Sequence, residues 1–209
     1  MEVASFRKKE LISNYVILGI FAIVSLAPIL VLIFNAFKPA VEFGTNPIGL
    51  PNNITFQNFP DAWIQGEYSK IFFNSFKLVL GTLILCISVS SLAGFSLAKL
   101  NPKGSNLVAI YLLVGISIPA QMFLLPLFLL WKNLGLLNTH IGLIIIYSAL
   151  NAPFATFLIR SYMIRLPDEL FDAAKIDGAN ILQQFFRVAI PLSWPVLLTS
   201  ALVVGLAVW

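Results

Sequence analysis

Charged side chains are scarce in this 209-residue chain, in which Asp, Glu, Lys and Arg make up 11% of the residues and apolar residues 59%. A soluble globular protein has about a quarter charged residues. This chain has too few of them to cover the surface of a soluble domain. The composition therefore excludes an ordinary soluble enzyme and predicts a membrane protein.

Cysteine and histidine are nearly absent, with one residue of each. Cys86 alone excludes an internal disulfide. His140 stands beside Thr139 in an expected external turn, where we interpret it as an ordinary interfacial side chain and not as a metal ligand. No glycine is followed by lysine, which excludes the phosphate-binding loop of ATPases. We therefore expect no catalytic residue, metal or cofactor, and the net charge of +4 requires no nucleic acid partner.

Long uncharged runs are what the chain does contain. About 20 helical residues cross the ~30 Å hydrocarbon layer of a bilayer, and these runs lack the alternating pattern of a membrane barrel. Backbone groups in lipid must be satisfied internally, which leaves helices. We predict an all-α integral membrane protein, a polytopic bundle with five spans. The predicted spans are residues 14–37, 78–98, 105–131, 133–159 and 188–209.

The basic residues indicate the orientation of these spans, because Lys and Arg accumulate on the cytoplasmic side. With a cytoplasmic N-terminus, nine of the 13 lie inside and three outside, and Lys77 reaches the outer headgroups from its span. We predict this topology in a cytoplasmic membrane of bacterial type. The inner residues are Arg7, Lys8, Lys9, Lys99, Lys103, Arg160, Arg165, Lys175 and Arg187, and the outer ones are Lys38, Lys70 and Lys132.

Two regions follow from this topology. Residues 1–70 are expected to form a retained anchor helix and an ordered but irregular, proline-rich external loop, and residues 71–209 a membrane domain. The cytoplasmic segment 160–187 mixes four acids with four bases, a pattern that predicts two short amphipathic helices joined at Gly178. Asp177 or Asn180 is expected to cap the second helix, and Pro191 to end the unit. An ordinary loop lying on the membrane surface would have the same composition.

The spacing of small and acidic residues in this segment resembles a known motif. Asp172-Ala173-Ala174, three residues, Gly178, nine residues and then Val188-Ala189-Ile190-Pro191 resemble the cytoplasmic coupling motif of ABC importer permeases. That motif has Glu, Ile and Leu where this chain has Asp172, Val188 and Ile190, and each replacement keeps the charge sign or the apolar character. The stretches 35–39, 74–77 and 118–119 look like those of the maltose-type carbohydrate permeases.

The resemblance implies a transmembrane subunit of an ATP-driven importer for a sugar or sugar derivative. Its expected partners are cytoplasmic ABC ATPase subunits, a second, different permease, an external solute-binding protein and membrane lipid. The ATPase would be contacted by Asp172, Ala173, Ala174, Asp177 and Gly178. The resembled permeases have a sixth span, so we expect the domain in residues 71–209 to be incomplete at its C-terminus.

Polar side chains inside the predicted spans are candidates for a solute path. Ser117, Gln121 and Asn151 would face a water-filled cavity, with Pro119, Pro126 and Pro153 bending their helices, although such polar groups more often bond to neighbouring helices. Every fourth residue from Cys86 to Ala98 is small, which predicts close helix packing. A secondary transporter would usually carry a charge in mid-membrane; that alternative and a non-transporting scaffold subunit stay open.

Overall fold

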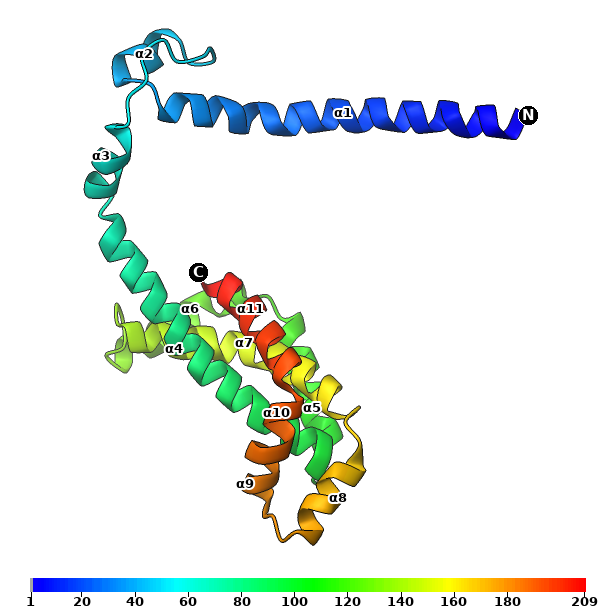
Figure 1. Cartoon of the computed structure of the whole chain (residues 1–209). Helices are drawn as coiled ribbons and strands as arrows, with labels where there is room; N and C mark the ends of the chain where they lie inside the picture. Colours follow the sequence, from blue (N-terminus) through cyan, green and yellow to red (C-terminus); the bar gives the residue numbers. More distant parts are fainter. Residues whose placement is uncertain (1) are drawn as a thin grey trace. The chain divides into compact units, whose positions relative to one another are not determined.

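The computed structural model describes the backbone of residues 2–209 and the side chains of residues 14–209. Every regular element in this part of the chain is helical, which confirms the predicted all-α fold (Figure 1). Two compact units, up to Ile71 and from Phe72 to Trp209, are described separately below. The helices are α1 (Glu2–Ala36), α2 (Ala40–Thr45), α3 (Asn58–Gln65), α4 (Tyr68–Phe95), α5 (Ser105–Ser117), α6 (Leu124–Asn133), α7 (His140–Met163), α8 (Asp168–Ile176), α9 (Ile181–Gln184), α10 (Ile190–Leu192) and α11 (Trp194–Val208), with π-helical turns η1 (Ser96–Leu100) and η3 (Phe185–Ala189) and the 3₁₀ turn η2 (Ala120–Phe123).

In the first unit, the connection after α1 is organised around a buried lysine. The side chain of Lys38 is 1% exposed, and its ammonium donates hydrogen bonds to the side-chain oxygen of Asn35 at 2.8 Å and to the carbonyl of Asn46 at 2.6 Å. The amide of Asn58 donates to the carbonyl of Lys38. These bonds compensate for the burial of a charge, and they hold together a connection that contains only the short helices α2 and α3.

The second unit is built on the packing of α4 against α7. Cys86 and Ser90 are 1% and 0% exposed, and the hydroxyl of Ser90 donates to the carbonyl of Ala152 at 3.3 Å. Cys86 also packs with Ala155 of α7 and Val204 of α11. Gly94 lies against Ile159 of α7 so closely that a Cβ would touch it. The predicted stripe of small residues is therefore confirmed as a packing surface.

The structure has three to five candidate membrane spans, a range that includes the five predicted ones, and two of the five differ in shape from the prediction. Three helical segments are long and apolar enough to cross a bilayer, namely Asn14–Ala36, Tyr68–Leu100 and His140–Met163. Two further segments are bent pairs, α5 with η2 and α6, and α9 to α10 with α11; they complete five spans if each pair crosses once. The chain is thus a multi-pass membrane protein.

The third predicted span, 105–131, is not one straight helix. Its two halves meet at 89°, because Pro119 holds the residue before it in an extended conformation and α5 ends at Ser117. The bend expected at Pro119 is therefore present. Pro126 lies in the first turn of α6, where a missing N–H costs little, and Pro153 lies inside the uninterrupted α7.

The boundaries of the last two predicted spans also differ from those in the structure. α7 begins at His140 and not near Asn133, because Gly135 and Asn138 have positive φ values of 67° and 57° that end helical winding. The expectation that Pro191 ends the cytoplasmic unit was wrong: helical winding continues through it, and the chain bends by 76° at Ser193. The final helix α11 therefore starts at Trp194.

We predict that Gly94→Ala destabilises the protein, because the added Cβ would lie 3.0 Å from Cγ2 of Ile159 and 3.2 Å from the backbone nitrogen of Arg160. Overpacking of this kind costs about 1–3 kcal/mol, so the melting temperature of the protein purified in detergent should fall by several degrees. The matched control is Gly115→Ala, whose Cβ would lie 3.8 Å from Pro153. It should melt at or above the wild-type temperature, and equal melting of both variants would contradict the close α4–α7 contact.

Candidate functional site

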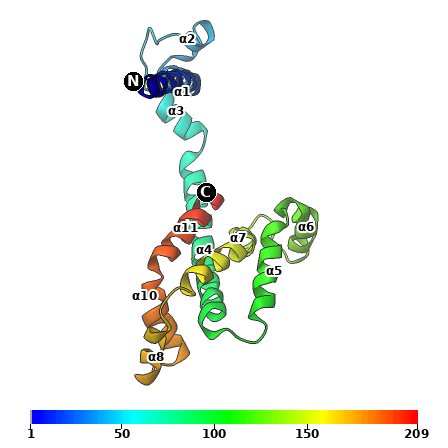
Figure 2. The same cartoon turned by 90° about the vertical axis from the view of Figure 1, so that its right-hand side faces the viewer.

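The segment between α7 and α11 folds back on itself at one end of the second unit (Figures 1 and 2). We call this segment, residues 164–193, the loop unit. Asp168 and Glu169 occupy the first turn of α8, where the helix dipole favours acids. Gly178 has a φ of +80°, the conformation that a glycine adopts without strain. Asn180 caps the second helix by a reciprocal pair of bonds with Gln183.

The residues predicted to contact an ATPase lie on α8 and in the turn that follows it. We call residues 172–178 the outer turn of the loop unit. Asp172, Ala173, Asp177 and Gly178 are exposed, and Ala174 is half-buried. The carboxylate of Asp172 accepts a hydrogen bond from Lys175 at 2.8 Å, an exposed ion pair that contributes little to stability. A shallow groove beside this turn is lined by Ala174, Asp177, Gly178, Ala179, Gln183, Arg187 and Val188.

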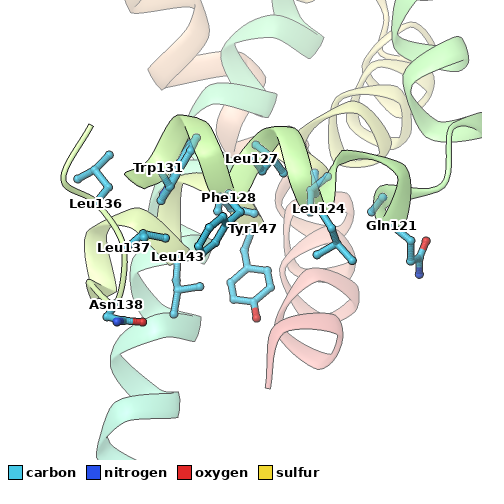
Figure 3. Close-up of a pocket in the computed structure, with 13 residues that line it drawn as sticks. Gln121, Leu124, Leu127, Phe128, Trp131, Leu136, Leu137, Asn138, Leu143 and Tyr147 are labelled. Carbon is cyan, nitrogen blue, oxygen red and sulfur yellow. The ribbon is translucent and has the colours of Figure 1, made fainter. Parts of the chain in front are cut away.

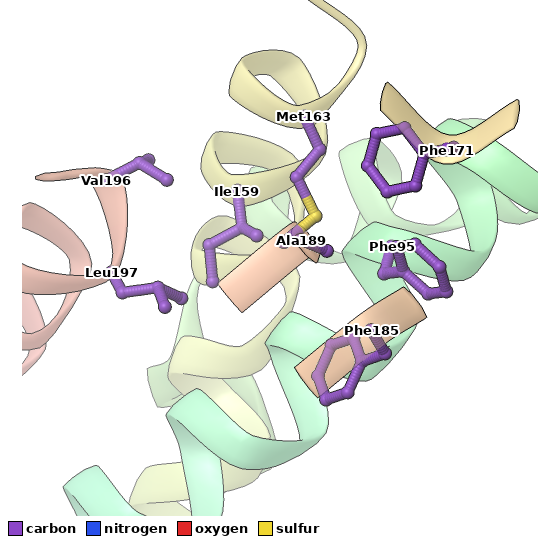
Figure 4. Packing of buried hydrophobic residues seen from close by; sticks show 8 residues of the cluster. All are labelled: Phe95, Ile159, Met163, Phe171, Phe185, Ala189, Val196 and Leu197. Carbon is purple, nitrogen blue, oxygen red and sulfur yellow. The ribbon is translucent and has the colours of Figure 1, made fainter. Parts of the chain in front are cut away.

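A buried apolar cluster attaches the loop unit to the long helices. Phe171 of α8 and Phe185 of η3 pack against Phe95 at the end of α4, with ring centroids 6.1 and 5.4 Å apart. Figure 4 shows these rings beside Ile159 and Met163 of α7. The cluster also contains Ala189, Val196 and Leu197. The three rings are only 3–4% exposed. Their burial fixes one face of the loop unit against the long helices, so that the opposite face is exposed.

Lys99 makes a second attachment that the sequence reasoning missed. Its ammonium donates hydrogen bonds of 2.6 Å to the carbonyl of Leu166 and to a carboxylate oxygen of Asp168. It also lies 5.1 Å from the ring centroid of Phe171. The hydrogen bond from Lys99, and then its charge, lower the pKa of Asp168 below its ordinary value of 3.8. In the sequence, Lys99 stands out only as one basic residue at a span end.

Of the three residues predicted to line a solute path, Gln121 lines the hollow described below, and Ser117 and Asn151 are not among the residues that line it. The hydroxyl of Ser117 donates to the carbonyl of Leu113 at 3.0 Å, and the amide of Asn151 donates to the carbonyl of Tyr147 at 2.8 Å. Each bond stays within one helix, so the expectation of bonds between helices was wrong for these two residues.

That hollow lies between α6 and α7 and has a volume of about 480 Å³. Figure 3 shows Gln121 and Asn138 at its opposite ends, with Phe128 and Tyr147 between them. Its wall is mostly apolar, and its polar side-chain groups are two amides, one phenol hydroxyl and the indole N–H of Trp131. This is the composition typical of sites for small organic molecules. The other lining residues are Ala120, Leu124, Leu127, Trp131, Leu136, Leu137, Leu143, Ile146 and Leu150.

The fold and the loop unit define a class of protein, a polytopic helical membrane protein with an anchored loop hairpin. Residues 90–209 match the family of binding-protein-dependent transport system inner membrane components. This match covers more than half of the chain. The chain belongs to that family.

Curated relatives match along nearly the whole chain. The diacetylchitobiose uptake system permease protein NgcG of Streptomyces coelicolor is 32% identical, over 94% of this chain and 65% of that protein. The arabinooligosaccharides transport system permease protein AraQ of Halalkalibacterium halodurans is 36% identical, over 90% of this chain and 68% of its own length. The chain thus spans about two thirds of the length of these relatives.

A solved structure has the same fold. It is a chain of a bacterial ABC transporter involved in the import of the acidic polysaccharide alginate. The TM-score is 0.75 at 27% sequence identity, and the match covers 97% of this chain and 71% of that one. The helices of this chain are therefore arranged like those of the matched part of that transporter chain.

We predict that the Lys99–Asp168 pair is lost in acid. A carboxyl group whose pKa is lowered by folding stabilises the folded state above its unfolded pKa and loses that effect as the pH falls through its folded pKa. The wild type should therefore melt above Asp168→Asn at neutral pH, and the difference should shrink as the pH falls below 3.8. Thermal unfolding from pH 7 to pH 3 measures it. A difference that grew in acid would contradict the assigned pair.

Proposed function

We propose that this chain is a permease subunit of an ATP-driven importer that moves a saccharide delivered by an external binding protein. The observation that carries the proposal is the loop unit, whose inner face is fixed to α4 and α7 by Phe95, Phe171 and Phe185 while its motif residues face outward. Membership in the binding-protein-dependent family supports it. ATP hydrolysis then belongs to a separate chain, since this sequence has no Gly-Lys pair.

The contact with the ATPase is assigned to the outer turn of the loop unit. Ala173 and Ala174 are small enough for a partner backbone to approach closely. The exposed carboxylates of Asp172 and Asp177 suit basic or amide groups on the partner. Gly178 reverses the chain, so that α8 and α9 present one compact surface. Binding of ATP would move this surface, and the aromatic cluster would carry the movement to the membrane helices.

A saccharide is the proposed solute class because the relatives are named for diacetylchitobiose and arabinooligosaccharides. Gln121 is the preferred path residue, since its amide borders the hollow between α6 and α7. Ser117 and Asn151 remain candidates through the oxygen atoms that their own helices do not engage. A second permease would complete the path. The distribution of Lys and Arg supports a cytoplasmic N-terminus and a cytoplasmic loop unit.

We predict an ATP-sensitive contact at Ala174. A single cysteine placed there, in a chain carrying Cys86→Ser, should cross-link to the co-expressed ATPase in membranes, and the yield should change when ATP is added. Leu107→Cys serves as the control, because Leu107 is 73% exposed on α5 and lies outside the loop unit. Equal yields at the two positions, with or without ATP, would sink the docking assignment.

We also predict that Gly178→Pro uncouples transport without preventing membrane insertion. Proline fixes φ near −65°, whereas Gly178 has a φ of +80°, so the outer turn must change. Uptake of radiolabelled diacetylchitobiose or arabinooligosaccharides should fall by at least about fivefold, as expected when a coupling of about 1–3 kcal/mol is lost. The matched control is Gly104→Pro, at another glycine of positive φ, 89°, in the turn between η1 and α5. Normal uptake in Gly178→Pro would contradict the coupling role.

A further inference from the structure

Lys99 has a buried ammonium whose hydrogen bonds and cation–π contact are with residues of the loop unit. Its side chain is 6% exposed, whereas the side chain of its partner Asp168 is 80% exposed. Lysines near the ends of spans usually extend their ammonium groups toward water. Here the ammonium turns inward, toward the carbonyl of Leu166 and the ring of Phe171. Lys103, four residues further on, is exposed and shows the ordinary behaviour.

The hydrogen bonds of Lys99 supply the directionality that the aromatic cluster lacks. Apolar attraction is strong but has no direction, so Phe95, Phe171 and Phe185 alone would let α8 rotate or slide against the end of α4. Hydrogen bonds from an ammonium to a carbonyl and a carboxylate are directional and are strengthened by the charge. Together the two bonds fix Leu166, two residues before α8, and Asp168, the first residue of α8, to one point on η1.

The backbone around Lys99 is unusual as well. Residues Ser96–Leu100 wind as a π-helical turn, and the N–H of Asn101 bonds to the carbonyl of Ser96 at 3.0 Å. Such turns are rare and frequently occur at functional sites. A second π-helical turn, Phe185–Ala189, contributes Phe185 and Ala189 to the same cluster. Both non-standard turns therefore lie where the loop unit meets α4 and α7.

We propose that Lys99 is a positioning residue that locks α8 to the end of α4, so that the loop unit and α4 move as one rigid body. The inference rests on the proposed function, in which the loop unit receives movement from an ATPase. Removing the ammonium while keeping the apolar stem should leave the cluster packed and the protein folded. It should also let α8 move independently of α4.

The test is a distance distribution between spin labels on α4 and α8, measured in the complex assembled with the ATPase. The labels replace Leu92 and Glu169, which are exposed on α4 and α8, in a chain carrying Cys86→Ser. In the otherwise unaltered chain the distribution should be narrow and unchanged by ATP. In Lys99→Met it should be at least about twofold broader and should shift with ATP. The matched control Lys103→Met should behave like the unaltered chain.

The variant Asp168→Asn distinguishes the contribution of the Lys99 ammonium from that of the ion pair. Asp168 is mostly exposed and Lys99 keeps its bond to Leu166 in this variant, so the distribution should stay within about 1.5-fold of the original width. A narrow distribution in Lys99→Met would overturn the lock and leave the docking proposal standing. Failure of the unaltered chain to bind the ATPase would overturn the docking proposal. In that case the width of the distance distribution in Lys99→Met, measured without the ATPase, would still decide whether α8 is locked to α4.

Discussion

Packing of Phe171 and Phe185 onto Phe95 is the contact on which the candidate site depends. The helices of the loop unit are nine and four residues long before the π-helical turn, and helices this short are marginal in water without tertiary contacts. Burial of these rings therefore both forms the helices and orients them. Once Phe171 points inward, helical geometry places Asp172 and Ala173 on other faces of α8.

The sequence predicted the parts of the loop unit that depend on neighbours along the chain. Gly178 predicts a left-handed turn, Asn180 a helix cap and Asp168 the start of α8. Each of these residues lies within four positions of the feature that it predicts. The role of Pro191 was misjudged because a proline at the start of a helical turn is tolerated, and the bend occurs at Ser193 instead. The outward orientation of the motif residues follows from periodicity, but their contact with a partner stays a prediction.

The interaction of Lys99 with Leu166 and Asp168 joins residues 67 and 69 positions apart. No local sequence pattern predicts this contact, because the contact depends on how α4 and α7 cross. That crossing is set by Gly94 and Ser90, whose small size the sequence did reveal. The sharp angles at Pro119 and Ser193 are a second example. A proline in a span predicts a break there, but it does not predict the size of the bend, which is 89° at the first site and 76° at the second.

The hydrogen bonds of the proposed path residues determine what each side chain can still offer a solute. Ser117 and Asn151 each donate to a carbonyl of their own helix. A hydroxyl has a single donor but two acceptor sites, whereas the amide of Asn151 keeps its oxygen and a second N–H. Ser117 can therefore only accept a further hydrogen bond, and Asn151 can both donate and accept. The amide of Gln121 and the hydroxyl of Tyr147 at the hollow also do both. Such a mixed set matches the hydroxyl groups of the proposed saccharide, which themselves donate and accept.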